Sequence, residues 1–444
     1  TITIGASGDT IALASGASQS GFGRTGTVDW DTTAKTTSFT AVSGDGFFIN
    51  TTSGAITMTL PASPSAGDIV AFKDYANTFD TNNLTIARNG SNIAGSAADA
   101  VISVEGQSGT LIYVDGTKGW MIVNASTDAD LPAPLFVTAT GGTITTSGDF
   151  KIHTFTSPGT FTVSCAGNLA GSNSVDYLVV AGGGGGSATN SGGGGAGGFR
   201  ESHSTPVSGC YTASPLATPT GVAVTAQGYP ISVGGGGSGG APPNGGGAKG
   251  SNSSALGITS TGGGYGIGDT ITTPSPGGSG GGGGGNCNGV NCGQAGNVPA
   301  VSPPQGNPGG DLARPSGSDV FAGGGGGAGG AGPDGGGNTS DPKGADGVGT
   351  QINPAAGTPG PSGPLKYFAG GGTGAWIRNA SPRSAGTPSL PGPNSGGGGT
   401  GVAGTCGNAA GNGTANSGGG GGGSRCNQGG TGGSGIVIIR YKFQ

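Results

Sequence analysis

Short apolar segments alternate with turns between residues 27 and 125. Strand-length segments rich in Val, Ile, Thr, Phe and Tyr occur at residues 36–42, 46–52, 55–61, 68–75, 83–90 and 109–123. Gly, Asn, Asp and Pro separate these segments, and none of them keeps the 3.6-residue period of an amphipathic helix. The pattern predicts an antiparallel β-sandwich or barrel-like module over residues 27–125.

The large apolar side chains of these segments form the predicted core of the module. They are Phe47, Phe48, Val70, Phe72, Leu111, Tyr113, Trp120 and Ile122. The sequence "VDGTKGW" at residues 114–120 places Asp-Gly between two apolar segments, which predicts a β-hairpin. Residues 1–26 form a shorter β segment, too small to be stable alone and suited to attachment or oligomerisation. Residues 126–135 are acidic and contain proline, and they are predicted to be a linker.

A second β pattern begins at residue 136 and leads into glycine. Residues 136–181 contain further strand-length segments, the last of which is "VDYLVVA". The chain then becomes glycine-rich over residues 182–434 and closes with the apolar strand "GIVIIRYKF" within residues 435–444. Because the glycine-rich region begins and ends on strands, we expect these two strands to lie close together. They are predicted to share one sheet with strands of residues 136–165.

Glycine is concentrated in one part of the chain. Of 110 glycines in 444 residues, 88 follow Val180, and that region has too few large apolar side chains for a conventional core. The glycine tracts have similar lengths, including 182–186, 192–198, 234–240, 277–285, 323–330 and 418–423. A flexible linker needs no such recurrence, and collagen needs a strict triplet register that is absent. The tracts favour a bundle of polyglycine-II helices, with essentially no α-helix in the chain, over the alternative of a disordered linker.

Charge and hydropathy restrict the partners of the protein. The formal net charge is −5, and Lys and Arg do not cluster, which argues against nucleic-acid binding. The sequence lacks an apolar stretch long enough to insert into a membrane. The first residues show neither the basic region nor the apolar region of a signal peptide, which favours a protein that is assembled in a cytoplasm.

No residue pattern predicts catalysis, a cofactor or a metal. His153 is expected to face solvent from a strand, and His203 lies in a loop beside Glu201 without an evident third partner. The cysteines lack the spacing of a zinc site. Carboxylates that could cleave glycosides lie in irregular inserts: Asp311, Asp319, Asp334, Asp341 and Asp346. We therefore expect a protein that binds and does not catalyse.

The inserts between glycine tracts hold most large side chains of the region. Aromatic rings stack on sugars and anchor protein interfaces, so we expect loop residues among them to contact a receptor. The candidates are Tyr265, Phe321, Tyr367, Phe368, Trp376 and Arg378. The alternative is that these residues cap the bundle ends.

Six cysteines suggest two disulfide bonds. Cys287 and Cys292 enclose a short loop, and Cys406 and Cys426 bracket another insert. These are the candidate pairs. Free thiols in a reducing cytoplasm are the alternative.

Several of these segments resemble phage proteins. The tracts "GGSGGGGGG" (277–285), "GGGGGAGG" (323–330) and "SGGGGGG" (417–423) resemble the polyglycine-II domain of the distal tail-fibre adhesins of T-even-type bacteriophages. The closing "GGSGIVIIRY" is similar to the end of glycine-rich domains in phage tail proteins. The N-terminal "FFINTTSGAITMTLP" and "GTLIYVDGTKGW" resemble a β module of marine phage tail fibres.

The resemblance implies a structural protein of the virion tail fibre that attaches to a host. Loops on a rigid glycine-rich scaffold would bind a surface carbohydrate or an outer-membrane protein. Partners would include other tail proteins and further copies of the chain, expected as a homotrimer. The alternative is a secreted glycine-rich adhesin or a self-assembling filament subunit of a cell.

Overall fold

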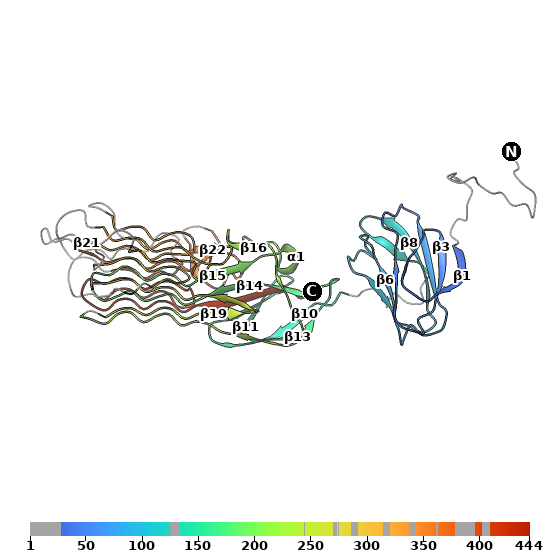
Figure 1. Ribbon diagram of the computed structural model, residues 1–444, viewed down its shortest axis with the longest axis horizontal. Helices are drawn as coiled ribbons and strands as arrows, with labels where there is room; N and C mark the ends of the chain where they lie inside the picture. Colours follow the sequence, from blue (N-terminus) through green and yellow to red (C-terminus); the bar gives the residue numbers. More distant parts are fainter. Residues whose placement is uncertain are drawn as a thin grey trace, which may run out of the picture. The chain divides into compact units, whose positions relative to one another are not determined.

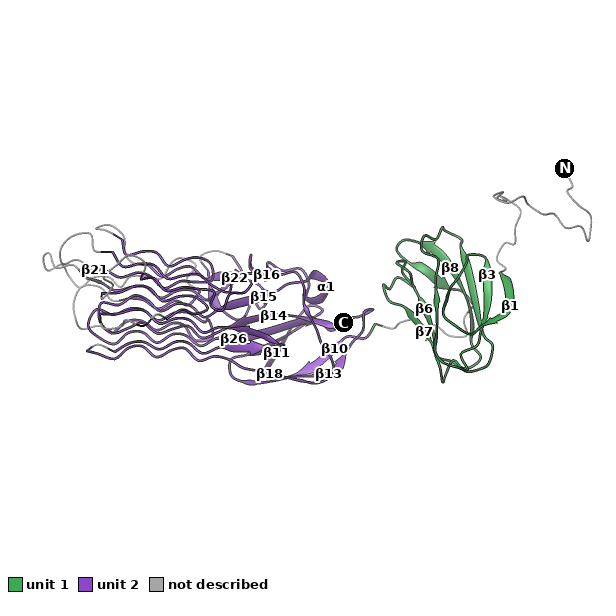
Figure 2. Cartoon of the chain, in the orientation of Figure 1, with its two compact units in different colours: residues 1–134 green, residues 135–444 purple. Residues whose placement is uncertain are grey.

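The structure is a computed structural model. It describes residues 28–124, 134–243, 245–269, 273, 275–285, 292–313, 320–336, 343–360, 363–377, 396–401 and 409–444. The predicted segment 1–26 and most of the predicted linker lie outside these residues. The chain forms two compact units, residues 1–134 and 135–444 (Figure 2). In the described residues β-strands dominate and the one helix, α1 (Thr205–Ser208), is four residues long, which confirms the prediction of a mostly β protein.

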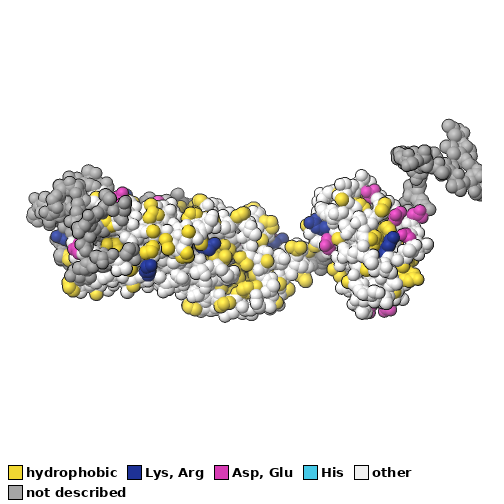
Figure 3. Space-filling view, viewed as in Figure 1, with side chains coloured by type: hydrophobic (Ala, Val, Ile, Leu, Met, Phe, Trp, Pro, Cys, Tyr) yellow, Lys and Arg dark blue, Asp and Glu magenta, His cyan; other side chains and the backbone are white. Residues whose placement is uncertain are grey.

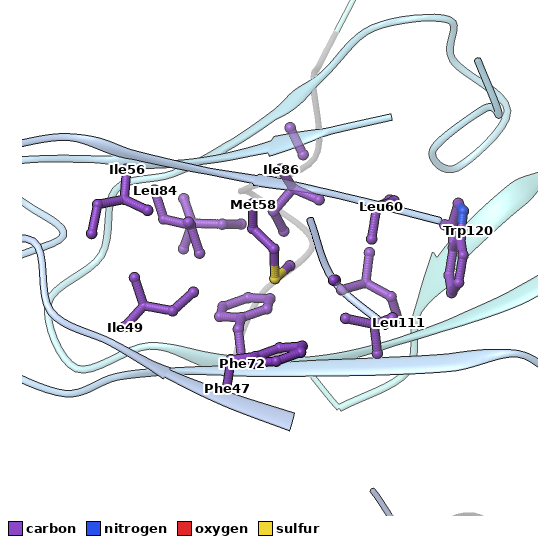
Figure 4. Packing of buried hydrophobic residues seen from close by; sticks show 14 of the residues in the cluster. Phe47, Ile49, Ile56, Met58, Leu60, Phe72, Leu84, Ile86, Leu111 and Trp120 are labelled. Carbon is purple, nitrogen blue, oxygen red and sulfur yellow. The ribbon is translucent and has the colours of Figure 1, made fainter. Parts of the chain in front are cut away.

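Unit 1 packs two sheets around one core. The first sheet contains, in spatial order, β1 (Asp29–Lys35), β3 (Asp45–Ile49), β5 (Ile69–Asp74), β8 (Ser108–Asp115) and β9 (Gly119–Ile122). The second contains β2 (Phe39–Thr40), β4 (Ile56–Thr59), β6 (Leu84–Ala87) and β7 (Ala100–Ile102). Phe47 and Phe72 from the first sheet meet Met58 and Ile86 from the second (Figure 4).

The prediction of an antiparallel module is wrong for most of unit 1. β1 pairs with β3, and β3 with β5, in parallel, and the same holds for β2 with β4 and for β4 with β6. The chain crosses to the other sheet after each strand from β1 to β5. It therefore returns to its first sheet in the same direction two strands later. The predicted hairpin is confirmed, since β8 and β9 are antiparallel and Asp115 Oδ1 accepts the Thr117 amide in the turn (2.8 Å).

The predicted core of unit 1 is largely confirmed. Five members are buried: Phe47, Val70, Phe72, Leu111 and Trp120. Tyr113 and Ile122 pack at the edge of the cluster. Phe48 instead lies on the outer face, where its ring contacts Trp30 and Tyr75, because it alternates with the inward-facing Phe47 along β3.

Unit 2 begins with a β base of two sheets. The larger one contains, in order, β11 (Thr143–Ser147), β12 (Phe150–Phe155), β26 (Ile436–Lys442), β14 (Ser174–Val180), β15 (Phe199–Ser202) and β16 (Ala217–Thr218), and β17 (Val222–Ala223) pairs with β14. The smaller one contains β10 (Val137–Thr140), β13 (Gly159–Ala166) and β18 (Gly228–Ile231). Short pairs lie elsewhere: β19 (Ser253–Ala255) with β20 (Ile258–Ser260), β21 (Val320–Phe321) with β25 (Trp376–Ile377), and β24 (Lys366–Phe368) between β22 (Val348–Thr350) and β23 (Thr358–Pro359).

The strands that begin and end the glycine-rich region are neighbours. β14 and β26 pair antiparallel, with Val180 opposite Ile436, and β12 lies on the other side of β26 (Figure 1). This confirms the prediction that the two strands share one sheet. Tyr177 and Val179 enter one core cluster, and Leu178 and Val180 enter another. Burial of both faces explains why these strands are almost continuously apolar.

The glycine-rich runs lie side by side and bond to one another (Figure 1). The amides of residues 182–186 donate, in order, to the carbonyls of Ser251, Gly433, Gly195, Ala248 and Gly430, over 2.9–3.0 Å. The first and fourth acceptors belong to one neighbouring run, and the second and fifth belong to another. Successive amides therefore face three directions and return to the same neighbour every third residue.

The carbonyls of the same run follow the same period. Gly182 and Gly185 accept amides from Gly263 and Gly266 of a single run. Within the described chain, residues 182–186 bond to six runs, at residues 192–198, 237–240, 248–251, 262–266, 418–423 and 430–433. These bonds between runs satisfy the backbone amides and carbonyls, which do not bond to one another within a run of this kind.

The spacing of the runs requires glycine. A Cβ added at Gly184 would overlap the carbonyl oxygen of Gly264, and one added at Gly194 would overlap that of Gly184. A side chain at either position would separate runs that are joined by hydrogen bonds. In the described part of the chain we find no helix with the length and apolarity needed to cross a membrane.

Candidate functional site

The turns farthest from the β base form the first candidate surface. Ala181 donates to the Gly198 carbonyl and Gly184 to that of Gly195, so the two runs are antiparallel and residues 187–191 turn at the end remote from β14. The pair β21–β25 lies at the same end in Figure 1. There Asn190 Nδ2 donates to Asp269 Oδ2 (2.6 Å), which joins two neighbouring turns.

Two predicted receptor-binding aromatics are buried. Phe321 is 3% exposed, and its amide and carbonyl bond to Ala313. Phe368 is fully buried in the cluster that contains Phe199 and Ile436. Large apolar side chains are scarce in this unit, and these two stabilise its packing. Neither is available to a receptor in this structure.

Two tyrosines of the candidate set remain partly exposed. Tyr265 lies along a glycine run, and its hydroxyl donates to the Thr273 carbonyl (3.1 Å). Tyr367 lies in β24 and lines a cleft of about 470 Å³ beside the β base. Tyr367 is therefore separate from the distal turns, whereas Tyr265 lies four residues before Asp269, which bonds to the 187–191 turn.

The other two candidates lie at or beyond β25. The backbone of Trp376 pairs with Phe321 between β25 and β21, which places this residue at the distal end. Arg378 lies outside the described residues, so its relation to Trp376 stays a prediction.

Cysteines of the glycine-rich unit differ in state. Cys292 and Cys426 are each disulfide-bonded, while Cys165 and Cys210 are free. Cys287 and Cys406 lie outside the described residues. Cys426 also forms an isolated β-bridge with Thr189, so this disulfide-bonded residue is attached to the 187–191 turn.

A buried polar network joins strands of the β base to α1 and to the segment that follows β22, and the sequence reasoning missed it. Asp176 in β14 accepts hydrogen bonds from Ser202 Oγ (2.7 Å) and Ser208 Oγ (2.6 Å). Arg440 in β26 donates to the carbonyls of Ser208 (2.8 Å) and Ile352 (3.1 Å). The signal was present in the sequence, because each charge interrupts an otherwise apolar strand.

Glu201 and His203 have different hydrogen-bond partners. Glu201 is 1% exposed and accepts the Ser214 amide (3.0 Å) and the Thr350 hydroxyl (2.6 Å). Its burial raises the pKa of the carboxyl group above the usual range, although these hydrogen bonds oppose the shift. His203 packs its ring against Tyr211, 4.3 Å between centroids. The two side chains hold loops to the end of β15.

The prediction that His153 faces solvent is wrong. The side chain is fully buried, with Nδ1 2.7 Å from the Gly141 carbonyl and Nε2 3.0 Å from the Tyr441 hydroxyl. Burial lowers its pKa, against the opposing effect of the bond to Gly141. Both faces of β12 are covered here, so neither side of the strand is a solvent face.

Two described carboxylates of the inserts accept backbone amides. Asp334 Oδ1 accepts the Asp311 amide and Asp311 Oδ1 accepts the Gly293 amide, each over 2.7 Å. Asp319 and Asp341 lie outside the described residues. Among the residues described, no three His, Cys, Asp or Glu side chains gather as a metal site would require. Charged side chains are also sparse on the face of unit 2 shown in Figure 3.

Comparison with known families identifies the larger unit. A family model described as a glycine-rich domain matches residues 156–442, which is more than half of the chain. The protein therefore belongs to this glycine-rich domain family. A search of curated proteins found none that matches the chain.

Proposed function

We propose that the protein is a bacteriophage tail-fibre adhesin whose glycine-rich runs form a polyglycine-II bundle. The observation that carries this proposal is the three-residue period of the hydrogen bonds made by residues 182–186. A helix of this type has three residues per turn and no internal hydrogen bonds, so each third amide faces the same neighbour. The phage resemblances of both units support the assignment to a tail fibre.

In this proposal the distal turns recognise a receptor on the host surface, either a carbohydrate or an outer-membrane protein. A scaffold whose backbone is bonded on all sides loses little conformational freedom when its turns bind, which favours affinity. The function is binding without catalysis and needs no cofactor. The protein would be assembled in the host cytoplasm and act outside cells as part of the virion.

Binding of the labelled full chain to a panel of Gram-negative strains tests the proposal. We expect binding to a subset of strains, and the double variant W376A/R378A should lose at least about tenfold in affinity. The matched control is W30A, which removes a 40% exposed tryptophan from unit 1 and should bind as the wild type does. Absence of binding to every strain, or an equal loss in W30A, would contradict the proposal.

The same preparation tests the expected assembly. A tail fibre attaches to other tail proteins and is expected to be a homotrimer, so native mass spectrometry should give three times the chain mass. A monomer contradicts the trimer. Filaments that sediment without binding cells would favour the filament subunit of a cell instead.

A further inference from the structure

We propose that the cleft beside β24 binds a neutral hexopyranose, with the Tyr367 ring as its platform. The cleft has a volume of about 470 Å³, within the range of about 300–1,000 Å³ that is typical of ligand pockets. It lies beside the β base, where Val348 and the neighbouring Phe368 enter a core cluster. The site is additional to the distal turns and does not depend on their function.

The Tyr367 ring is seated by glycines. Tyr367 pairs with Gly349 across β24 and β22, so the ring lies on the same face of this small sheet as Gly349. A Cβ added at Gly349 would lie 3.0 Å from Cζ of the ring, and one added at Gly360 would overlap the ring. The ring therefore packs against backbone at both glycines, and Tyr367 lines the cleft together with Gly349.

The strand beneath the ring is fixed from the opposite side. Phe368 is fully buried, and alternation along β24 turns the neighbouring Tyr367 the other way. Among the described residues the Tyr367 hydroxyl has no hydrogen-bond partner. The Tyr367 side chain is thus held at the wall of the cleft by a strand that is buried on its other face.

Polar groups stand at the rim of the platform. Thr212 lines the cleft, and two hydrogen bonds hold its backbone to Gln351: the Gln351 amide donates to the Thr212 carbonyl (2.9 Å), and the Thr212 amide donates to Gln351 Oε1 (3.0 Å). The half-buried Asp346 also lines the cleft. Leu216 and Leu365 complete apolar walls.

This combination selects the ligand class. The C–H face of a pyranose stacks on an aromatic ring, and its hydroxyls donate to carboxylate and hydroxyl oxygens. Among the described residues that line the cleft there is no Lys, Arg or His. The carboxylate of an acidic sugar would therefore meet no cation among these residues. A neutral hexopyranose satisfies both conditions.

Saturation-transfer NMR on the full chain tests the site. The probes are the methyl glycosides of glucose, galactose and mannose, together with methyl glucuronide. We expect transfer to ring C–H protons of at least one neutral glycoside and none to the glucuronide. Y367L should lower the affinity about tenfold and Y367F should retain most of it. The matched control is Y75L, which removes a 60% exposed tyrosine from unit 1 and should change nothing.

A second variant keeps the proposal falsifiable if Y367L fails to fold. Thr212 is exposed, so T212V should fold and bind the neutral glycoside more weakly. Absence of transfer to every neutral glycoside, or full binding by folded Y367L or by T212V, would overturn the proposal. None of these readouts depends on cell binding by the distal turns.

Discussion

The Ala181 amide donates to the Gly198 carbonyl over 3.0 Å, one residue beyond the last pair of β14 and β15. This bond continues the antiparallel ladder of the β base into the first two glycine runs. Gly182 and Gly183 then donate to two other runs, and Gly184 returns to the first partner at Gly195. The sheet therefore sets the register of the hydrogen-bonded glycine-rich runs, called the glycine lattice below. It does so at the point where β14 continues into the first run.

Substitution of a lattice glycine should destabilise unit 2. G184A places a Cβ where the Gly264 carbonyl oxygen lies, so the runs must separate. We expect a loss of about 1–3 kcal/mol in the free energy of unfolding, measured by urea denaturation. The matched control is G235A, because a Cβ at Gly235 meets nothing within 4 Å. Equal stability of the two variants would show that the runs are not closely packed.

Backbone amides of the lattice should exchange slowly with solvent. Each amide of residues 182–186 and 192–198 donates to a neighbouring run, so exchange requires the runs to part. Hydrogen exchange read by mass spectrometry should show protection of both segments comparable to that of β14. Rapid exchange across both segments would mean that the runs are a flexible tether.

Stability should fall as the pH drops below about 6.5 because of His153. Burial lowers the pKa of this imidazole in the folded state below its ordinary value of 6.5, so the unfolded chain binds protons more readily. The contribution of the neutral imidazole is complete above that value and is lost as the pH falls toward the folded pKa. H153Q should flatten the dependence of the melting temperature on pH between about 6.5 and 5. Identical slopes in the two proteins would contradict this assignment.

Arg440 should be difficult to replace, even by lysine. Its guanidinium lies 5.1 Å from the centroid of the Phe150 ring and 5.0 Å from that of Tyr211, and it bonds to two carbonyls. R440K keeps the charge but loses the planar group, so we expect a loss of about 1.5–3 kcal/mol in stability by thermal unfolding. K442M, at a half-buried position of the same strand, is the control and should change stability by less than about 1 kcal/mol.

Local patterns in the sequence predicted the strands of both units and the pairing of β14 with β26. They could not predict which sheet each strand of unit 1 joins, because alternation fixes only the two faces of a strand. The parallel pairs arise from crossings between sheets, and nothing in the residues of β2 or β4 marks a crossing. The hairpin at Asp115 was predictable because its turn residues are local.

The sequence also did not predict the burial of single residues, because that burial depends on tertiary contacts. His153 and Phe368 lie on strands whose second face is covered by segments far away in the sequence. The cleft at Tyr367 depends on glycines at positions 349 and 360, which contact the ring only after folding. Tyr367 was among the candidates because it is aromatic, but the residues that surround it could not be predicted from the sequence.

The pairing of Val180 with Ile436 places both ends of residues 181–435, the segment that contains the glycine-rich runs, on two adjacent strands of the larger sheet of the β base. Its two ends meet at one place, so an exchange of genetic material at two points could replace every glycine-rich run and leave β11, β12, β14 and β26 in place. A lineage could thus acquire a different set of distal turns in one recombination event, with the strands that hold the unit retained.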